Sequence, residues 1–120
     1  MAHHVVWFDI PVIDLDRAIE FYSEVLDLEV IQESFGGMPI AIFSHEGNDV
    51  SGCLCKSKTD RPSTIGPLLY LNVNGRLDEA VAAVEEYGGT VLQPPQQIGA
   101  YGYRAIVLDS EGNRIALHSA

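Results

Sequence analysis

An internal repeat is the feature of this chain of 120 residues that most restricts its fold. Residues 15–32 read LDRAIEFYSEVLDLEVIQ, and residues 77–93 read LDEAVAAVEEYGGTVLQ. Both segments open with Leu-Asp-x-Ala and an aliphatic residue, and both end with an aliphatic pair and a glutamine. The tripeptide at 46–48, Glu-Gly-Asn, returns at 111–113. Two copies of one structural unit are therefore expected.

The first copy combines one helix with four strands. Apolar residues alternate over 6–12, which is typical of a strand with one buried face. A helical stripe of apolar residues runs from Ala18 to Leu26, and Asp14 precedes it as a capping residue. Strands are expected at about 28–35, 38–45 and 49–56, separated by glycine-containing turns.

The second copy repeats this order. Residues 69–73 alternate, a helical stripe runs over 77–84, and strands are expected at roughly 90–98, 102–109 and 113–119. Runs of strands between single helices predict an α+β fold made of two βαβββ repeats. We expect a single domain over 1–120, with repeat 1 at about 4–56, a linker at about 57–65 and repeat 2 at about 66–120.

Composition argues against some classes of function and indicates a cellular location. The formal net charge of −10 disfavours nucleic-acid binding, because such a surface repels phosphates. No apolar run is long enough for a membrane span, and the first twelve residues lack the pattern of a secretory signal, so a cytoplasmic location is expected. Cys53 and Cys55 stand two apart in an extended segment, which favours reduced thiols over a disulfide.

Two motifs carry a resemblance to a known family. Residues 10–22 read IPVIDLDRAIEFY, and residues 109–118 read DSEGNRIALH. They resemble the opening and closing signatures of the vicinal oxygen chelate superfamily, which includes glyoxalases, bleomycin-resistance proteins and dioxygenases. The resemblance implies two curled mixed sheets, each with a helix on its convex face, around a cleft built within one chain or across two chains. It also implies a homodimer, because small relatives of this kind often form symmetric dimers.

The resemblance also implies where a metal ion would be held in metal-dependent relatives. Counted from the two motifs, those positions are Trp7, Leu68, Ser51 and Ala116, whose side chains are poor donors or none. We therefore expect neither metal nor cofactor at the usual site. A displaced site formed by Cys53, Cys55 and His118 stays open, although buried cysteines are more often small apolar fillers.

Strand alternation places a set of polar and aromatic side chains toward the cleft. Aromatic residues there suit a flat or apolar ligand, although aromatics at strand spacing are also common in cores. A carboxylate or an imidazole in a cleft can move protons, so Asp9 and His118 are candidate catalytic residues; a surface aspartate and a structural histidine are the alternatives. The predicted ligand-binding residues are Trp7, Asp9, Tyr70, Asn72, Tyr103 and His118.

Three functions are compatible with these residues. Their order follows from the expected cleft and from the poor donors at the usual metal positions. The first is a glyoxalase/bleomycin-resistance-like protein that binds a small organic ligand without the usual metal. The second is a metal-independent isomerase, epimerase or lyase, and the third is a metal-dependent lyase or dioxygenase with rearranged ligands. The segment 94–103, with prolines at one end and glycines around an aromatic pair, is either a lid over the cleft or an ordinary connection between strands.

Overall fold

Two similar units make up the protein in the computed structural model, which describes residues 3–120. The first contains β1 (Trp7–Pro11), α1 (Leu15–Leu26), β2 (Val30–Phe35), β3 (Met38–Phe43) and β4 (Ser51–Cys55). The second contains β5 (Leu69–Asn72), α2 (Leu77–Glu86), β6 (Thr90–Gln97), the short 3-10 helix η1 (Gly99–Tyr101), β7 (Tyr103–Leu108) and β8 (Arg114–Ser119). This order confirms the two predicted βαβββ repeats.

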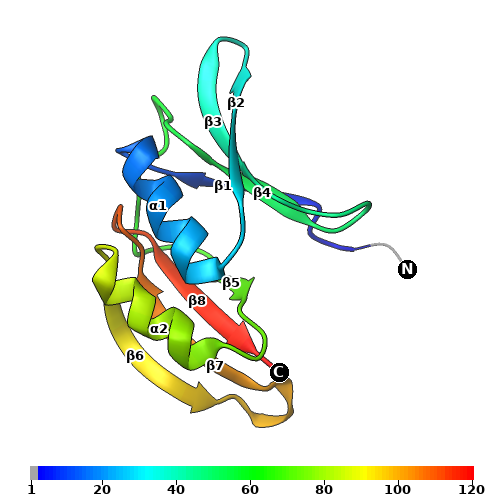
Figure 1. Cartoon of the computed structure of the whole chain (residues 1–120), viewed down its shortest axis with the longest axis vertical. Coiled ribbons are helices and arrows are strands. Elements are labelled where there is room, and N and C mark those ends of the chain that lie inside the picture. Colours follow the sequence, from blue (N-terminus) through cyan, green and yellow to red (C-terminus); the bar gives the residue numbers. More distant parts are fainter. Residues whose placement is uncertain (1–2) are drawn as a thin grey trace.

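Each unit forms its own four-stranded mixed sheet. The strand orders are β1-β4-β3-β2 and β5-β8-β7-β6, and the sheets do not close into one barrel. The first and last strands of each unit pair in parallel, and the remaining pairs are antiparallel. The two helices lie side by side (Figure 1), with α1 packed against the first sheet and α2 against the second. Neither helix in residues 3–120 is long and apolar enough to cross a bilayer.

The core lies between the helices and the sheets. The carboxylate of Asp14 accepts a hydrogen bond from the Arg17 amide at 3.1 Å and so caps α1 as predicted. One face of α1 is fully buried, and burial alternates from residue to residue along β1 and β5. Ile10 and Leu71 are buried, whereas Trp7 and Tyr70 on the opposite face are 44% and 42% exposed. The predicted alternation of these two strands is confirmed.

Glu111 joins the two units. Its carboxylate accepts hydrogen bonds from the amides of Ile13 and Asp14 at 2.8 and 2.7 Å, and it pairs with Arg17 Nε at 2.7 Å. The turn before β8 therefore holds the start of α1, which belongs to the other unit. The Glu111 side chain is fully buried in this arrangement. Burial raises its pKa, but the hydrogen bonds from Arg17 and the amides outweigh that effect and bring the pKa down to about 2.

The strand pairing corrects the position on the last strand of the first unit that counting from the Glu-Gly-Asn turns had given as a metal position. Val12 N donates to the Cys55 carbonyl, and Val73 N donates to the His118 carbonyl, both at 2.9 Å. Cys55 is therefore the counterpart of His118, and, two residues earlier, Cys53 rather than Ser51 is the counterpart of Ala116. The count failed because β8 starts directly after its Glu-Gly-Asn turn, whereas two residues, 49 and 50, separate the first turn from β4.

The segment 94–103 is an ordinary connection between neighbouring strands. Pro94 and Pro95 lie within β6, where the pairing with β7 is irregular, and η1 closes the hairpin. Ile98 N donates to the Gly102 carbonyl at 2.8 Å across its base. The lid alternative gains no support from this geometry.

Candidate functional site

A pocket of about 560 Å³ lies on the concave side of the first sheet, away from the helices. Strands β1, β3 and β4 form its floor, the β2–β3 turn forms one wall, and the segment after β4 forms the rim. Its lining residues are Trp7, Asp9, Phe35, Met38, Ile40, Cys53, Cys55, Ser57, Lys58 and Asp60.

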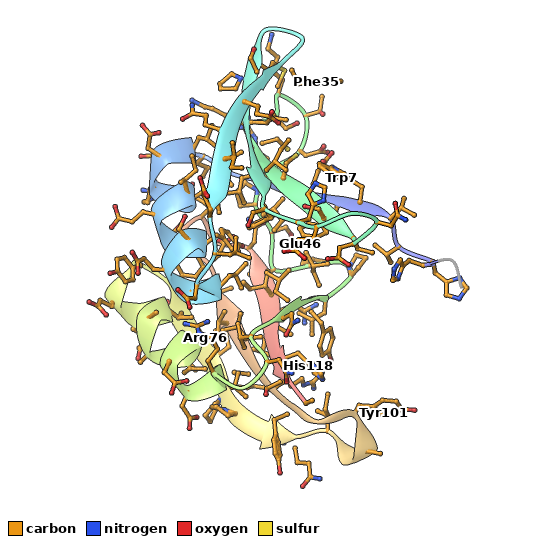
Figure 2. All side chains as sticks on the ribbon, turned by 45° about the vertical axis from the view of Figure 1, so that its right-hand side comes forward. Trp7, Phe35, Glu46, Arg76, Tyr101 and His118 are labelled. Atoms are coloured by element: carbon orange, nitrogen blue, oxygen red, sulfur yellow. The ribbon has the colours of Figure 1, made fainter. Side chains whose placement is uncertain are left out.

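The walls of this pocket are apolar yet open to solvent. Phe35 and Met38 face each other across the β2–β3 turn, and they are 76% and 42% exposed. Gly36 and Gly37 make that turn with φ angles of +57° and +82°, which side chains rarely tolerate. Trp7 enters from β1, on the same side as Phe35 (Figure 2). Large exposed apolar groups that converge on a concavity are typical of ligand-binding surfaces.

The floor of the pocket is polar. Asp9 Oδ1 accepts a hydrogen bond from the Trp7 indole Nε1 at 3.0 Å and another from the Cys53 thiol at 3.3 Å. Cys55 lies next to Cys53 on the same face of β4, and both cysteines are free. Burial, together with the neighbouring Asp9 carboxylate, raises the pKa of Cys53 to about 12 and also raises that of Cys55. Both groups are therefore neutral thiols at neutral pH.

A second pocket of about 540 Å³ lies on the concave side of the other sheet. His118 Nε2 stands 2.5 Å from the carbonyl oxygen of Tyr101, and because a carbonyl only accepts, Nε2 carries a proton. The Arg104 guanidinium lies over the ring of Tyr70, with its Cζ atom 5.8 Å from the ring centroid, and donates a hydrogen bond to the Tyr70 hydroxyl. Figure 2 shows His118 and Tyr101 on the side away from the helices, which is also the side of Trp7.

The structure distributes the predicted ligand-binding residues over several places. Trp7 and Asp9 share the first pocket, and Tyr70 and His118 share the second. Asn72 uses its side-chain oxygen to accept a hydrogen bond from the Asn74 amide at 2.8 Å, which stabilises the turn after β5.

The two candidate catalytic residues, Asp9 and His118, lie in different pockets. Cys53 and Cys55 line the first pocket and His118 the second, so these three do not form one cluster.

Tyr103 does not face either of these pockets. It pairs with Ser119 across the sheet, while its neighbour Arg104 pairs with His118, so alternation turns Arg104 toward the second pocket and Tyr103 away from it. Tyr103 lines a different groove beside the start of α2. Sequence reasoning also missed Phe35 and Met38; the sequence signal was an apolar residue on each side of the Gly-Gly turn.

The usual metal site of the family does not fit these residues. With the corrected register, its positions in the first unit are Trp7 and Cys53, and those in the second unit are Leu68 and Ala116. Cys53 has a donor atom that suits a cation, but an indole, an isobutyl group and a methyl group do not. Ser51, which the count had proposed, is buried and donates its hydroxyl to the Phe43 carbonyl at 2.8 Å.

Fold and pockets together define a small protein of two related α+β units, each curled around a concave face that can hold a ligand. The chain belongs to the Glyoxalase/Bleomycin resistance protein/Dioxygenase superfamily, whose family model matches residues 2–117. The family resemblance and the fold predicted from sequence are thereby confirmed.

Solved structures agree with this assignment. TnmS3, an antibiotic binding protein from Streptomyces sp. CB03234, is 25% identical, with a TM-score of 0.74 over 98% of this chain and 96% of its own. A glyoxalase/bleomycin resistance protein from the same strain is 26% identical, with a TM-score of 0.71 over 95% and 98% of the two chains. One from Albidiferax ferrireducens T118, at 20% identity and a TM-score of 0.75 over 98% and 100%, shares the fold. A search of curated proteins found no match.

Proposed function

We propose that this protein binds a small organic molecule with a flat apolar part in the pocket of the first unit. The observation that carries the proposal is the convergence of Trp7, Phe35 and Met38, all substantially exposed, on one concavity of about 560 Å³. An apolar ligand gains free energy there because it removes these side chains from water. Asp9 and Lys58 at the floor and rim supply polar groups that orient it.

The similarity to an antibiotic binding protein supports binding as the first function to test. An enzyme that uses Asp9 or His118 as a base is less well supported. The Asp9 carboxylate oxygen that accepts from Trp7 also accepts from Cys53, and the His118 Nε2 proton is directed at the Tyr101 carbonyl. Each candidate base is thus engaged with its neighbours, and the two do not share a pocket.

The single tryptophan makes the proposal easy to test. Trp7 is the one tryptophan of the chain and lies in the pocket, so its fluorescence reports directly on a bound molecule. We suggest titrating the protein with a panel of polycyclic aromatic antibiotics and aromatic metabolites. Saturable quenching or a blue shift, with heat of binding in calorimetry, is the expected result. Flat titrations over the whole panel by both methods would contradict the proposal.

Variants locate the binding site. Phe35→Ala and Met38→Ala should weaken binding of a panel hit about ten-fold or more, since each removes a large part of the apolar wall. Tyr101→Ala is the matched control, because Tyr101 is 81% exposed and lines the pocket of the second unit. Equal losses in all three variants would place the ligand elsewhere.

We also propose that the protein forms a homodimer in the cytoplasm. Exposed apolar side chains outside both pockets, such as Val6, Ile65 and Leu92, leave surface that a second copy can cover. The two free thiols fit a reducing compartment. Light scattering after size exclusion tests the dimer: a mass of twice 13.1 kDa is expected, and a monomer at all concentrations would refute it.

A further inference from the structure

Three potential metal ligands gather on the floor of the first pocket. One carboxylate oxygen of Asp9 and the sulfur atoms of Cys53 and Cys55 all lie within 4.8 Å of one another. Asp9 comes from β1 and the cysteines from β4, and the parallel pairing of these strands sets Asp9 directly beside Cys53. Two thiols on alternate residues of one strand converge poorly by themselves, but here the third donor comes from the adjacent strand.

The kind of donor decides which cation suits the cluster. Two sulfur atoms and one carboxylate oxygen are a soft and mostly thiolate set, which favours Zn²⁺ and related thiophilic ions over Mg²⁺ or Ca²⁺. We propose that Asp9, Cys53 and Cys55 form a binding site for a thiophilic divalent cation such as Zn²⁺. This site differs from the family's usual one, because all three donors belong to one unit and only Cys53 occupies a family position.

Access and charge agree with a cation site. Cys53 is buried and Cys55 is half-buried, while Asp9 is exposed to the pocket, so an ion can enter from solvent. The formal charge of the chain, −10, favours cation approach. Three protein donors leave one position of a tetrahedral zinc ion for water or for a donor atom of a molecule in the pocket. The inference does not depend on the proposed organic ligand.

Binding has a proton balance that can be measured. Both thiols are protonated at neutral pH, and burial beside Asp9 holds the pKa of Cys53 at about 12. A divalent cation forms two metal–sulfur bonds and one metal–oxygen bond, and each sulfur loses its proton to solvent. One cation bound therefore releases two protons, and affinity rises with pH.

The test uses the reduced, chelator-treated full chain. Titration with Cd²⁺ should give ultraviolet charge-transfer absorption typical of cadmium–thiolate bonds, saturating at one ion per chain, and Zn²⁺ should displace it. Weakly buffered solutions should show release of two protons per ion. Asp9→Asn, Cys53→Ser and Cys55→Ser should each weaken binding about ten-fold or more, since each removes one of three ligands.

Two control variants separate this site from others. His3→Ala/His4→Ala removes a possible imidazole site near the N-terminus, and Asp60→Asn removes a carboxylate from the rim of the same pocket. Both should bind Cd²⁺ as the parent does. Failure to saturate, or binding that survives in the Asp9→Asn and Cys55→Ser variants, would overturn the proposal. Circular dichroism of each variant verifies folding, and Asp9 and Cys55 are not fully buried, so these changes spare the core.

The outcome also separates this inference from the proposed function. Binding of the organic panel is measured in chelator, without any cation, and cation binding is measured without any organic molecule. Loss of the apolar wall in Phe35→Ala should leave Cd²⁺ binding unchanged, because Phe35 contributes no donor atom to the cluster. Either proposal can therefore fail while the other stands.

Discussion

Replacing Glu111 with glutamine tests how the two units are held together. The charged carboxylate accepts hydrogen bonds from the amides of Ile13 and Asp14 and from Arg17, and its side chain is fully buried. Its pKa falls from 4.5 to about 2 on folding, a shift that corresponds to about 3 kcal/mol of stability at neutral pH. Arg17 is half-exposed, and water weakens its share, so we expect Glu111→Gln to cost about 2–3 kcal/mol.

The pH dependence follows from the sign of the shift. Because the folded-state pKa of Glu111 is lowered, the stabilisation is fully present above pH 4.5 and is lost as pH falls toward 2. The difference in unfolding free energy between the parent and Glu111→Gln should therefore shrink by roughly half between pH 7 and about pH 3. Urea denaturation at a series of pH values measures it.

Glu46→Gln is the matched control for this experiment. Glu46 opens the same Glu-Gly-Asn tripeptide in the first unit, but it is exposed. Its replacement should change the unfolding free energy by less than about 0.5 kcal/mol at any pH. A gap between parent and Glu111→Gln that stays constant from pH 7 to 3 would refute the electrostatic reasoning. Equal effects of the two variants would refute the role of the turn as a link between units.

Three further predictions concern the core and the thiols. Tyr22→Phe removes the hydrogen bond from a fully buried hydroxyl to Asp109 and should lower the unfolding free energy by about 1–3 kcal/mol; an unchanged urea midpoint would contradict this. Gly52→Ala should cost about 1–3 kcal/mol, since its methyl group would stand 2.5 Å from the ring of Phe8; a neutral effect would show that β1 and β4 can separate freely. Cys53, with a pKa near 12, should react with iodoacetamide far more slowly than a free peptide thiol at pH 8, as followed by mass spectrometry; equal rates would contradict its burial.

Much of the fold could be predicted from the sequence because it depends on local patterns. The alternation of apolar residues sets which face of β1 and β5 is buried, and the helical stripes with the cap at Asp14 set the helices. The repeated Glu-Gly-Asn tripeptide indicated a duplication, but it did not indicate that its two copies have different surroundings in the fold. Glu111 is buried against α1 whereas Glu46 is exposed, and nothing within the tripeptide itself distinguishes the two.

The site was harder to predict, since it depends on register and on distance in space. The connection between the Glu-Gly-Asn turn and the last strand is two residues longer in the first unit than in the second. Cys53 therefore occupies the metal position that counting from the turn had given to Ser51. The alternation along β1 correctly predicted that Trp7 and Asp9 lie on the concave face. It does not predict which of the two pockets a residue lines. His118 was thus grouped with the cysteines although it belongs to the other sheet. The contribution of the β2–β3 turn depends on the curl of the sheet, which brings Phe35 over the floor.

Backbone amide spectra of the ¹⁵N-labelled protein, recorded with and without a molecule that quenches Trp7 fluorescence, test the central claim most directly. Binding in the first unit should shift the Trp7 indole signal and the amides of Phe35, Met38 and Ile40, while those of Tyr101 and Arg104 stay in place. Shifts confined to Tyr101, Arg104 and His118 would move the binding site to the second unit and contradict the account.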